Sequence, residues 1–341
     1  MKTKLHRTLT ALLILALLLP MGAHAFEMED VSPDDWFYRY VMRGLDFGLI
    51  TGTSGDSFRF EPNRPVTWAE FVTMLGRLHE YQDGNSISNP ADGTFYGRYL
   101  TWAVEHGIVL GNQHGDLMPR ILITREQMAV MVYRYIDAFE LQRHLPPQRN
   151  HNTVPVDYQD ISSWARHDVV QMMFSYGLMW GTSRLPILFN PQANSTRAEA
   201  LTVLVRLGDV LYDATRFVVT VTVEETSLPQ GEPFIVNIEL RNNSGEDHEI
   251  RYFYGRLFRP IIQDWWPLPV HPEIRSRFFE ANNVIRNARS GGDESRSWSI
   301  FPNLEPGTHE LKVGAGFWLN FGQENEQFIT VWSDPIMLTV Q

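Results

Sequence analysis

The sequence predicts a two-module chain of α + β class, in which an all-α module of three helix–loop–helix repeats precedes an all-β sandwich. A glycine-punctuated pattern recurs three times before residue 213, and each copy ends in an apolar helical period. After residue 216, apolar and polar residues alternate with period two between turn-forming segments. The 341 residues include no cysteine, so neither module is held together by disulfides.

The first 25 residues predict an export signal. Three basic residues precede an apolar run of ten, Ala11–Pro20, and Ala23 and Ala25 are small residues at the two positions that a signal peptidase reads. The run is too short to span a bilayer comfortably, and no later stretch approaches a membrane span. We therefore expect cleavage after Ala25 and an exported, soluble mature protein of 341 − 25 = 316 residues.

The charge balance excludes some partners. Lys and Arg number 29 against 40 Asp and Glu, a net charge of −11. This balance argues against bulk binding to nucleic acid or to anionic lipid, although it allows a local basic pocket. The histidines are scattered with no pair at metal-ligand spacing, so we expect no metal and no cofactor.

The repeats are expected over residues 26–82, 92–140 and 156–213. In each, a first helix ends at a glycine, a second glycine follows four residues later, and a proline-containing loop leads to a second helix. The polar, proline-rich segment Leu141–Val156 is expected to be an inter-repeat loop. The glycine pairs are Gly48 and Gly52, Gly107 and Gly111, and Gly177 and Gly181.

The second helix of each repeat is expected to begin at a threonine N-cap, with an acid or amide three residues later as a capping box. Both residues of the box then have a structural role, whereas the residue after the threonine has none. That residue is Trp68 in the first repeat and arginine in the other two. The capping pairs are Thr67 with Glu70, Thr124 with Gln127, and Thr196 with Glu199.

This pattern resembles the S-layer homology domain, most specifically in the Thr-Arg-Ala-Glu string at Thr196–Glu199. The resemblance covers roughly Phe26 to Leu211. It implies a pseudo-threefold helical assembly whose inter-repeat grooves bind a secondary cell-wall polysaccharide on peptidoglycan. In many Gram-positive bacteria the bound epitope is a pyruvylated N-acetylmannosamine, and the contact is non-covalent. The implied location is the cell wall or S-layer surface of a bacterium.

The resemblance also implies which residues bind the polymer. Arg125 and Arg197 match the family arginine, and an arginine fork suits the single carboxylate of a pyruvate ketal. Trp68 in place of arginine implies at most two competent grooves, which can still anchor through avidity. The aromatic residues near the first-helix starts, Trp36, Phe95 and Trp164, either stack on a sugar or pack in the core. The loops of Gly52, Gly111, Gly181 and Thr182 either turn the chain or contact the ligand.

The final module, residues 216–341, is expected to be an immunoglobulin-like β-sandwich of seven short strands. Residues 255–291 do not fit the strand rhythm and include Trp265-Trp266, either a sugar or partner platform or a plug over the sandwich. The partner of this module does not follow from its fold. The strands are expected over residues 217–224, 234–240, 248–254, 296–301, 308–315, 327–332 and 336–340.

These observations favour a non-enzymatic cell-wall anchor. Its sandwich either binds a partner or acts as a spacer that holds one away from the wall. No hydrolase or phosphate-loop motif occurs, and the β module is smaller than most sugar-cleaving folds. One alternative is an extracellular hydrolase or hydrolase inhibitor with the sandwich as its active module. A second is a self-assembling surface-lattice protein.

Overall fold

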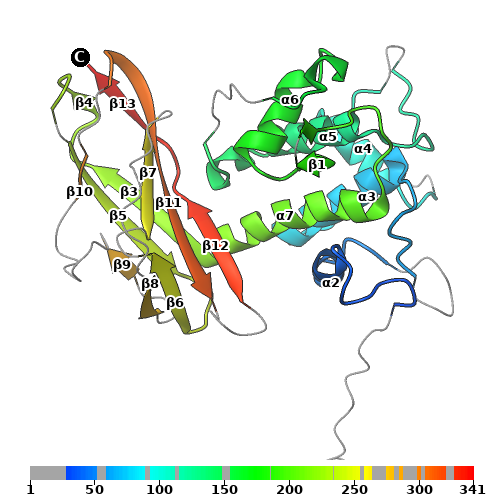
Figure 1. The fold of residues 1–341 in the computed structure, drawn as a ribbon, viewed down its shortest axis with the longest axis horizontal. Helices are drawn as coiled ribbons and strands as arrows, with labels where there is room; N and C mark the ends of the chain where they lie inside the picture. Colours follow the sequence, from blue (N-terminus) through cyan, green and yellow to red (C-terminus); the bar gives the residue numbers. More distant parts are fainter. Residues whose placement is uncertain are drawn as a thin grey trace, which may run out of the picture.

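The computed structural model describes residues 28–51, 59–88, 93–111, 115–147, 154–184, 186–232, 234–253, 257–262, 274–279, 284–286, 298–300, 304–319 and 326–341. The expected export signal, Gly52 and Trp265-Trp266 lie outside the described residues. A helical part is followed by β-sheets, the α + β arrangement expected from the sequence (Figure 1). None of the described helices is long and apolar enough to cross a bilayer.

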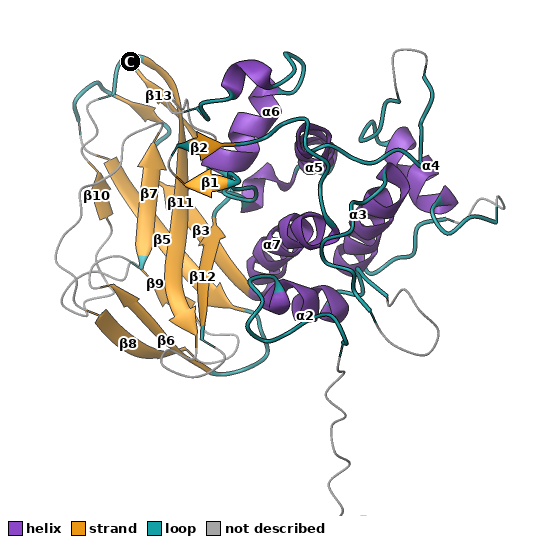
Figure 2. Cartoon of the chain, turned by 45° about the vertical axis from the view of Figure 1, so that its right-hand side comes forward, coloured by secondary structure: helices purple, strands orange, loops and turns teal. Residues whose placement is uncertain are grey.

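The helical part consists of three units, each with a first helix, a loop and a second helix (Figure 2). One 3₁₀ turn lies between the second and third units, a second precedes the first helix of the third, and a short hairpin lies in the loop of the third. In chain order the elements are α2 (Tyr38–Asp46), α3 (Trp68–Asp83), α4 (Gly97–Glu105), α5 (Arg125–Ala138), η1 (Leu141–His144), η2 (Tyr158–Asp160), α6 (Arg166–Val170), the π-helical turn η3 (Gln171–Ser175), β1 (Ser183–Arg184), β2 (Ile187–Leu188) and α7 (Arg197–Arg216).

The first helix of each unit ends where the sequence predicts. Gly48, Gly107 and Gly177 have φ of 67°, 68° and 64°, the left-handed region in which a Cβ atom is strained. The second helices begin at Thr67, Thr124 and Thr196, and each has a reciprocal capping box.

The three second helices meet at their N-termini in a closed ring of backbone hydrogen bonds. The residues before the capping threonines form it: Val66 N donates to Ser195 O, Ser195 N to Ile123 O, and Ile123 N to Val66 O, at 3.0, 2.9 and 2.9 Å. The first amide of each second helix then donates to the loop of another unit. Because these bonds link every unit to the other two, the N-terminal ends of α3, α5 and α7 are fixed around one point.

The β part consists of two sheets. The first has the order β10-β5-β3, with β9 also paired to β5. The second has the order β4-β13-β11-β6-β8, with β7 and β12 also paired to β11. The strands are β3 (Phe217–Val223), β4 (Ser227–Leu228), β5 (Phe234–Asn242), β6 (His248–Phe253), β7 (Phe258–Ile262), β8 (Ile274–Phe279), β9 (Val284–Arg286), β10 (Trp298–Ile300), β11 (Gly307–Leu319), β12 (Gln327–Trp332) and β13 (Ile336–Val340).

The two sheets enclose a hydrophobic core separate from that of the helical part. Phe217 of β3 and Phe317 of β11 meet edge to face at 5.1 Å between ring centroids. Strands β7, β8 and β9 lie within residues 255–291, so the expectation that this segment falls outside the strand pattern was wrong. Pro260, which lacks an N–H, interrupts the pattern, yet it pairs with Val313 because β11 provides a long partner strand.

The helical and β parts are joined without a linker, since α7 ends at Arg216 and β3 begins at Phe217 (Figure 1). A second contact involves Leu141–Val156, which was expected to be only a loop. Its first four residues form η1, and the Nζ of buried Lys312 on β11 donates to Gln142 O and Leu145 O at 2.7 and 2.6 Å. This buried lysine connects the second sheet to the helical part.

Candidate functional site

A cavity of about 410 Å³ lies between the units and is here called the Arg197 groove. Arg197 comes from the third unit, the loop and α3 residues come from the first, and Phe95 precedes α4 of the second. The groove is therefore lined by all three units. Its lining residues are Leu49, Ile50, Thr51, Arg64, Glu70, Thr73, Met74, Arg77, Phe95 and Arg197.

Arg197 follows the capping threonine of α7 and is buried, with 7% of its surface exposed. Its Nε donates to Phe60 O at 2.7 Å, and its Nη1 lies 4.0 Å from Glu70 Oε1. Within the described residues, neither terminal guanidinium nitrogen makes a hydrogen bond. Burial lowers the pKa of Arg197 from its ordinary value, but a guanidinium stays charged in proteins. Arg197 therefore brings a cation with spare donors to the groove wall.

Arg125, the corresponding residue of α5, is similarly buried but makes more hydrogen bonds within the protein. Its Nε donates to Phe189 O at 2.8 Å, its Nη2 to Trp180 O at 2.8 Å, and its Nη1 to Glu199 at 3.2 Å. Burial lowers the pKa of Arg125 as well. Three of its five N–H groups thus already have protein acceptors, against one for Arg197, so the two family-matched arginines are not equivalent.

Trp68 takes the same place in the first unit. It is buried, and its indole Nε1 donates to Gln127 Oε1 at 3.1 Å. At each of the other two interfaces between units, an arginine lies beside a glutamate of another unit: Arg125 beside Glu199, and Arg197 beside Glu70. At the Trp68 interface both members differ, with tryptophan in place of arginine and Gln127 in place of glutamate. The change leaves a neutral hydrogen bond in place of an ion pair.

The Arg197 groove is also lined by two arginines, Arg64 and Arg77, that were not predicted from the sequence as site residues. Arg64 donates to Glu70 at 2.6 Å and to Glu61 at 3.0 Å. Burial works to raise the pKa of Glu70, but hydrogen bonds from Arg64 and from the N–H of Thr67 outweigh it, so that pKa is lowered. Arg77 donates from Nη1 to Leu49 O at 3.1 Å.

A repeat signal for Arg77 was present in the sequence. Each second helix has an arginine ten residues after its capping threonine: Arg77, Arg134 and Arg206. Arg206 donates to Leu178 O at 3.1 Å, as Arg77 does to Leu49 O, and its guanidinium lies 4.1 Å from the ring centroid of exposed Trp180. Arg64 had no such signal, because Ile121 and Ala193 occupy the corresponding positions.

The aromatic residues before the first helices are exposed rather than packed in the core. Trp36, Phe95 and Trp164 expose 60%, 64% and 55% of their surface. The next residues in the chain, Phe37 and Ala165, are buried in place of Trp36 and Trp164. Core packing therefore does not account for these rings, and Phe95 lines the Arg197 groove.

The described glycine loops have close structural contacts. A Cβ on Gly111 would lie 2.8 Å from the backbone of Gly115, and one on Gly181 would lie 2.7 Å from Leu188 O. Thr182 N donates to Leu188 O at 2.7 Å, and its hydroxyl accepts from Asn190 at 2.6 Å. These contacts account for the residue types by turn geometry, and the ligand role of Gly111, Gly181 and Thr182 stays a prediction.

Two aspartates hold the loops that accept from the buried arginines. Asp30 accepts from Phe60 N at 2.8 Å and from Glu61 N at 2.7 Å. Asp157 accepts from Phe189 N at 2.9 Å and from Asn190 N at 2.7 Å. Asp157 is therefore the counterpart of Asp30 in the third unit, although the chain between this aspartate and the next α-helix is longer there.

In the described ranges, no group of three or more His, Asp or Glu side chains is arranged to hold a metal ion.

Comparison with known proteins gives a family match in the first unit. Residues 27–72 match the family model "S-layer homology domain". The chain is 32% identical over 215 residues to an endoglucanase of Bacillus sp. (strain KSM-635), covering 60% of this chain and 22% of that protein. It is 23% identical over 198 residues to an S-layer protein of Bacillus thuringiensis subsp. finitimus, covering 57% and 22%.

The chain spans less than a quarter of the length of these relatives. Among solved structures, the CARDB domain of the PF1109 protein from Pyrococcus furiosus is 8% identical with a TM-score of 0.21, over 37% of this chain and 87% of that one. A likeness at that level has no bearing on the fold. Residues 27–72 thus match the S-layer homology domain, and the relatives of this chain include S-layer proteins.

Proposed function

We propose that this chain anchors an exported protein non-covalently to the bacterial cell wall. In this proposal the three units are three S-layer homology repeats, over residues 26–82, 92–140 and 156–213, that form a pseudo-threefold assembly. Their ligand is a secondary cell-wall polysaccharide on peptidoglycan that carries a carboxylate, such as a pyruvylated sugar. The β part, residues 216–341, is an immunoglobulin-like module that binds or spaces a partner outward.

The observation that carries the proposal is the Arg197 groove. A saccharide bearing one carboxylate needs a cation with free N–H donors and a surface for its ring. Arg197 has two terminal nitrogens free of hydrogen bonds in the described residues, and Arg64 and Arg77 add positive charge. Phe95, exposed on the same wall, offers a face on which a sugar stacks.

The three interfaces are proposed to bind unequally. Arg125 already donates to three protein acceptors, so its interface starts with fewer free donors. Trp68 has no guanidinium to offer. The Arg197 groove is therefore the strongest site for an acidic sugar, and weaker sites add affinity only when they engage the same polymer.

We propose a binding role rather than catalysis for the helical part. More than half of this chain is similar both to an endoglucanase and to S-layer proteins, whose names indicate different activities. A segment shared by such different proteins is better explained as a common attachment module.

The test is co-sedimentation of the full mature chain with Gram-positive sacculi that retain or lack their secondary polymer. We expect polymer-dependent binding that Arg197→Gln weakens at least about tenfold, because a charge-assisted hydrogen bond is lost. Arg125→Gln is the matched control and should weaken binding less. Sacculus binding is compared only between variants whose unfolding midpoint equals that of the wild type, since these variants are folded.

Binding that needs no polymer would contradict the proposal. So would binding that survives Arg197→Gln combined with Arg77→Gln in a folded protein.

A further inference from the structure

A second cavity, of about 500 Å³, opens beside the Arg197 groove; we call it the Arg120 cavity. It is lined by the N-terminal end of α3, by the segment that leads into α4 and by the loop that leads into α5. Three side chains, Arg64, Glu70 and Phe95, line both cavities. The Arg120 cavity therefore extends the Arg197 groove along a shared wall.

Contacts between the units hold Arg120 at this cavity. Trp68 N donates to Ile121 O and Ala69 N donates to Pro119 O, each at 2.9 Å. These two bonds fix the residues on both sides of Arg120, whose own side chain is exposed. The first turn of α3 thus sets the place of Arg120, although the two belong to different units.

The repeat geometry does not account for an arginine at this position. Pro62 and Pro191 accept from the second helix of another unit at 3.0 and 3.1 Å, as Pro119 does. The residues that follow them are Asn63 and Gln192. Within the described residues Arg120 makes no hydrogen bond or ion pair, so the protein itself makes no use of its guanidinium.

The two cavities together carry an excess of positive charge. Among the described residues that line them are four arginines, Arg64, Arg77, Arg120 and Arg197, and one acid, Glu70. Arg64 already bonds to Glu70 at 2.6 Å. Arg197 lines the first cavity alone and Arg120 the second alone, so they form two separate positions for an anionic group.

An exposed aromatic ring links these two positions. Phe95 lines both cavities and exposes 64% of its surface. Tyr96, which lines the Arg120 cavity, meets its ring edge to face at 5.1 Å between centroids. Because a sugar ring can stack on such a face, adjoining sugars can pass from one cavity to the other over Phe95.

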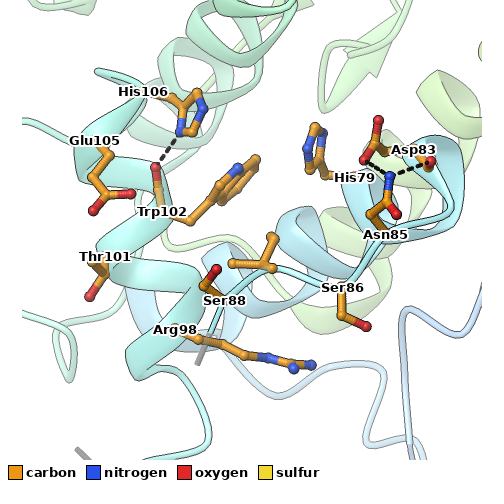
Figure 3. A pocket seen from close by; sticks show the side chains of 11 residues that line it. His79, Asp83, Asn85, Ser86, Ser88, Arg98, Thr101, Trp102, Glu105 and His106 are labelled. Carbon is orange, nitrogen blue, oxygen red and sulfur yellow. Dashed lines mark hydrogen bonds between the residues drawn. The ribbon is translucent and has the colours of Figure 1, made fainter. Parts of the chain in front are cut away.

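A different cavity, also of about 500 Å³, lies between the C-terminal end of α3 and the side of α4 (Figure 3). It shares no lining residue with the Arg197 groove or the Arg120 cavity. Its arginine, Arg98, lies 3.4 Å from Glu80 and also bonds to the hydroxyl of Tyr99. This cavity therefore neither extends the groove nor offers an unpaired arginine.

We propose that the Arg197 groove and the Arg120 cavity form one site for two adjoining sugars of the polymer, each carrying an anionic group. The first anionic group pairs with Arg197 and the second with Arg120, whose planar guanidinium suits a carboxylate or a phosphate. The link between the two sugars crosses Phe95. This inference rests on the proposed function, because it assigns a second subsite to the same polymer.

The experiment is calorimetric titration of the full mature chain with oligosaccharides cut from the secondary polymer of sacculi and separated by length. We expect fragments of two or more sugars to bind more tightly than the single acidic sugar. Arg120→Gln should weaken binding of the longer fragments about two- to fivefold, the size of an exposed ion pair, and leave the single sugar unchanged. Arg120→Lys, which keeps the charge, should retain most of the binding.

Arg241→Gln is the matched control. Arg241 is an exposed arginine of β5 that makes no hydrogen bond or ion pair within the described residues, so its loss should leave every affinity unchanged. Arg120 is exposed as well, so its variants should fold.

Four results would overturn the inference: equal affinity for single and longer fragments, wild-type affinity in Arg120→Gln, an equal loss in Arg120→Lys, or an equal loss in Arg241→Gln. Failure of the proposed function gives a different pattern. In that case no fragment binds to the wild type, or Arg197→Gln leaves the affinity for every fragment unchanged.

Discussion

Restoring an ion pair at Trp68 tests the interpretation of the three interfaces. The indole of Trp68 donates to Gln127 at 3.1 Å, where the equivalent Arg125 donates to Glu199 at 3.2 Å. Trp68→Arg alone would bring a guanidinium to a neutral amide at a largely buried position. Gln127→Glu alone would bring a carboxylate to an indole. Only the double variant reproduces the pairing seen at Arg125.

The expected magnitudes follow from burial. Truncating a buried tryptophan to alanine costs about 3–5 kcal/mol. The aliphatic stem of arginine keeps part of that packing, so we expect Trp68→Arg to lower the free energy of unfolding by about 2–4 kcal/mol. A hydrogen bond between charged groups contributes about 1.5–3 kcal/mol. Adding Gln127→Glu should therefore recover about 2 kcal/mol of the loss.

The assay is urea unfolding of the wild type, both single variants and the double variant, analysed as a double-mutant cycle. The same cycle on Arg125→Gln and Glu199→Gln is the positive control, since that pair already exists. A coupling energy near zero at positions 68 and 127, with clear coupling at 125 and 199, would refute the equivalence of the interfaces.

Three other predictions concern stability. Asp30→Ala should lower the free energy of unfolding by about 2–4 kcal/mol, because it leaves two amides of the Phe60 loop without an acceptor; urea unfolding measures it, and a change below about 0.5 kcal/mol would contradict it. Burial raises the pKa of Asp213 to about 7, above its value in the unfolded chain, so the protonated carboxyl group stabilises the fold in acid and this contribution is lost as pH rises to 7. Asp213→Asn should therefore make the melting temperature depend less on pH between pH 4 and 7. An unchanged pH dependence in this variant would contradict the prediction. Burial lowers the pKa of Lys312 to about 8, below its value of 10.5 in the unfolded chain, so the thermal stability of the protein should rise as pH goes from about 8 towards 10.5. Lys312→Met should remove that rise in the same measurement. A rise that persists in this variant would show that Lys312 is not its cause.

Local signals in the sequence predicted the helical part well. Capping boxes and left-handed glycines depend on neighbours within a few residues, so the helix start at Thr196 and the helix end at Gly177 could be predicted from the local sequence. Hydrogen bonds to distant loops leave no signal in the local sequence. Asp157 was not identified from the sequence, because the bond from Phe189 N to Asp157 joins residues 32 apart.

The candidate site was predictable only in part. The family motif identified Arg125 and Arg197 but could not show that Arg125 has three protein acceptors and Arg197 has one. Exposure of Trp36 and Trp164 could not be deduced from helical period alone, since these residues precede their helices. Segment 255–291 was misjudged because strands such as β7 pair through distant partners.

The position of the arginines explains why one unit is insufficient for the proposed site. Arg197 lies at the first residue of α7, and its backbone N–H donates to Arg64 O in the first unit at 2.9 Å. That bond directs the side chain away from its own unit and towards Phe60 and Glu70 of another. The family-matched residues 27–72 thus supply the groove loop and Glu70, but neither Arg197 nor Phe95, and the α3 residues Thr73, Met74 and Arg77 also lie outside them. The proposed binding therefore requires all three units in their closed ring. Disrupting any one unit should weaken binding at the Arg197 groove even when the other two units are unchanged.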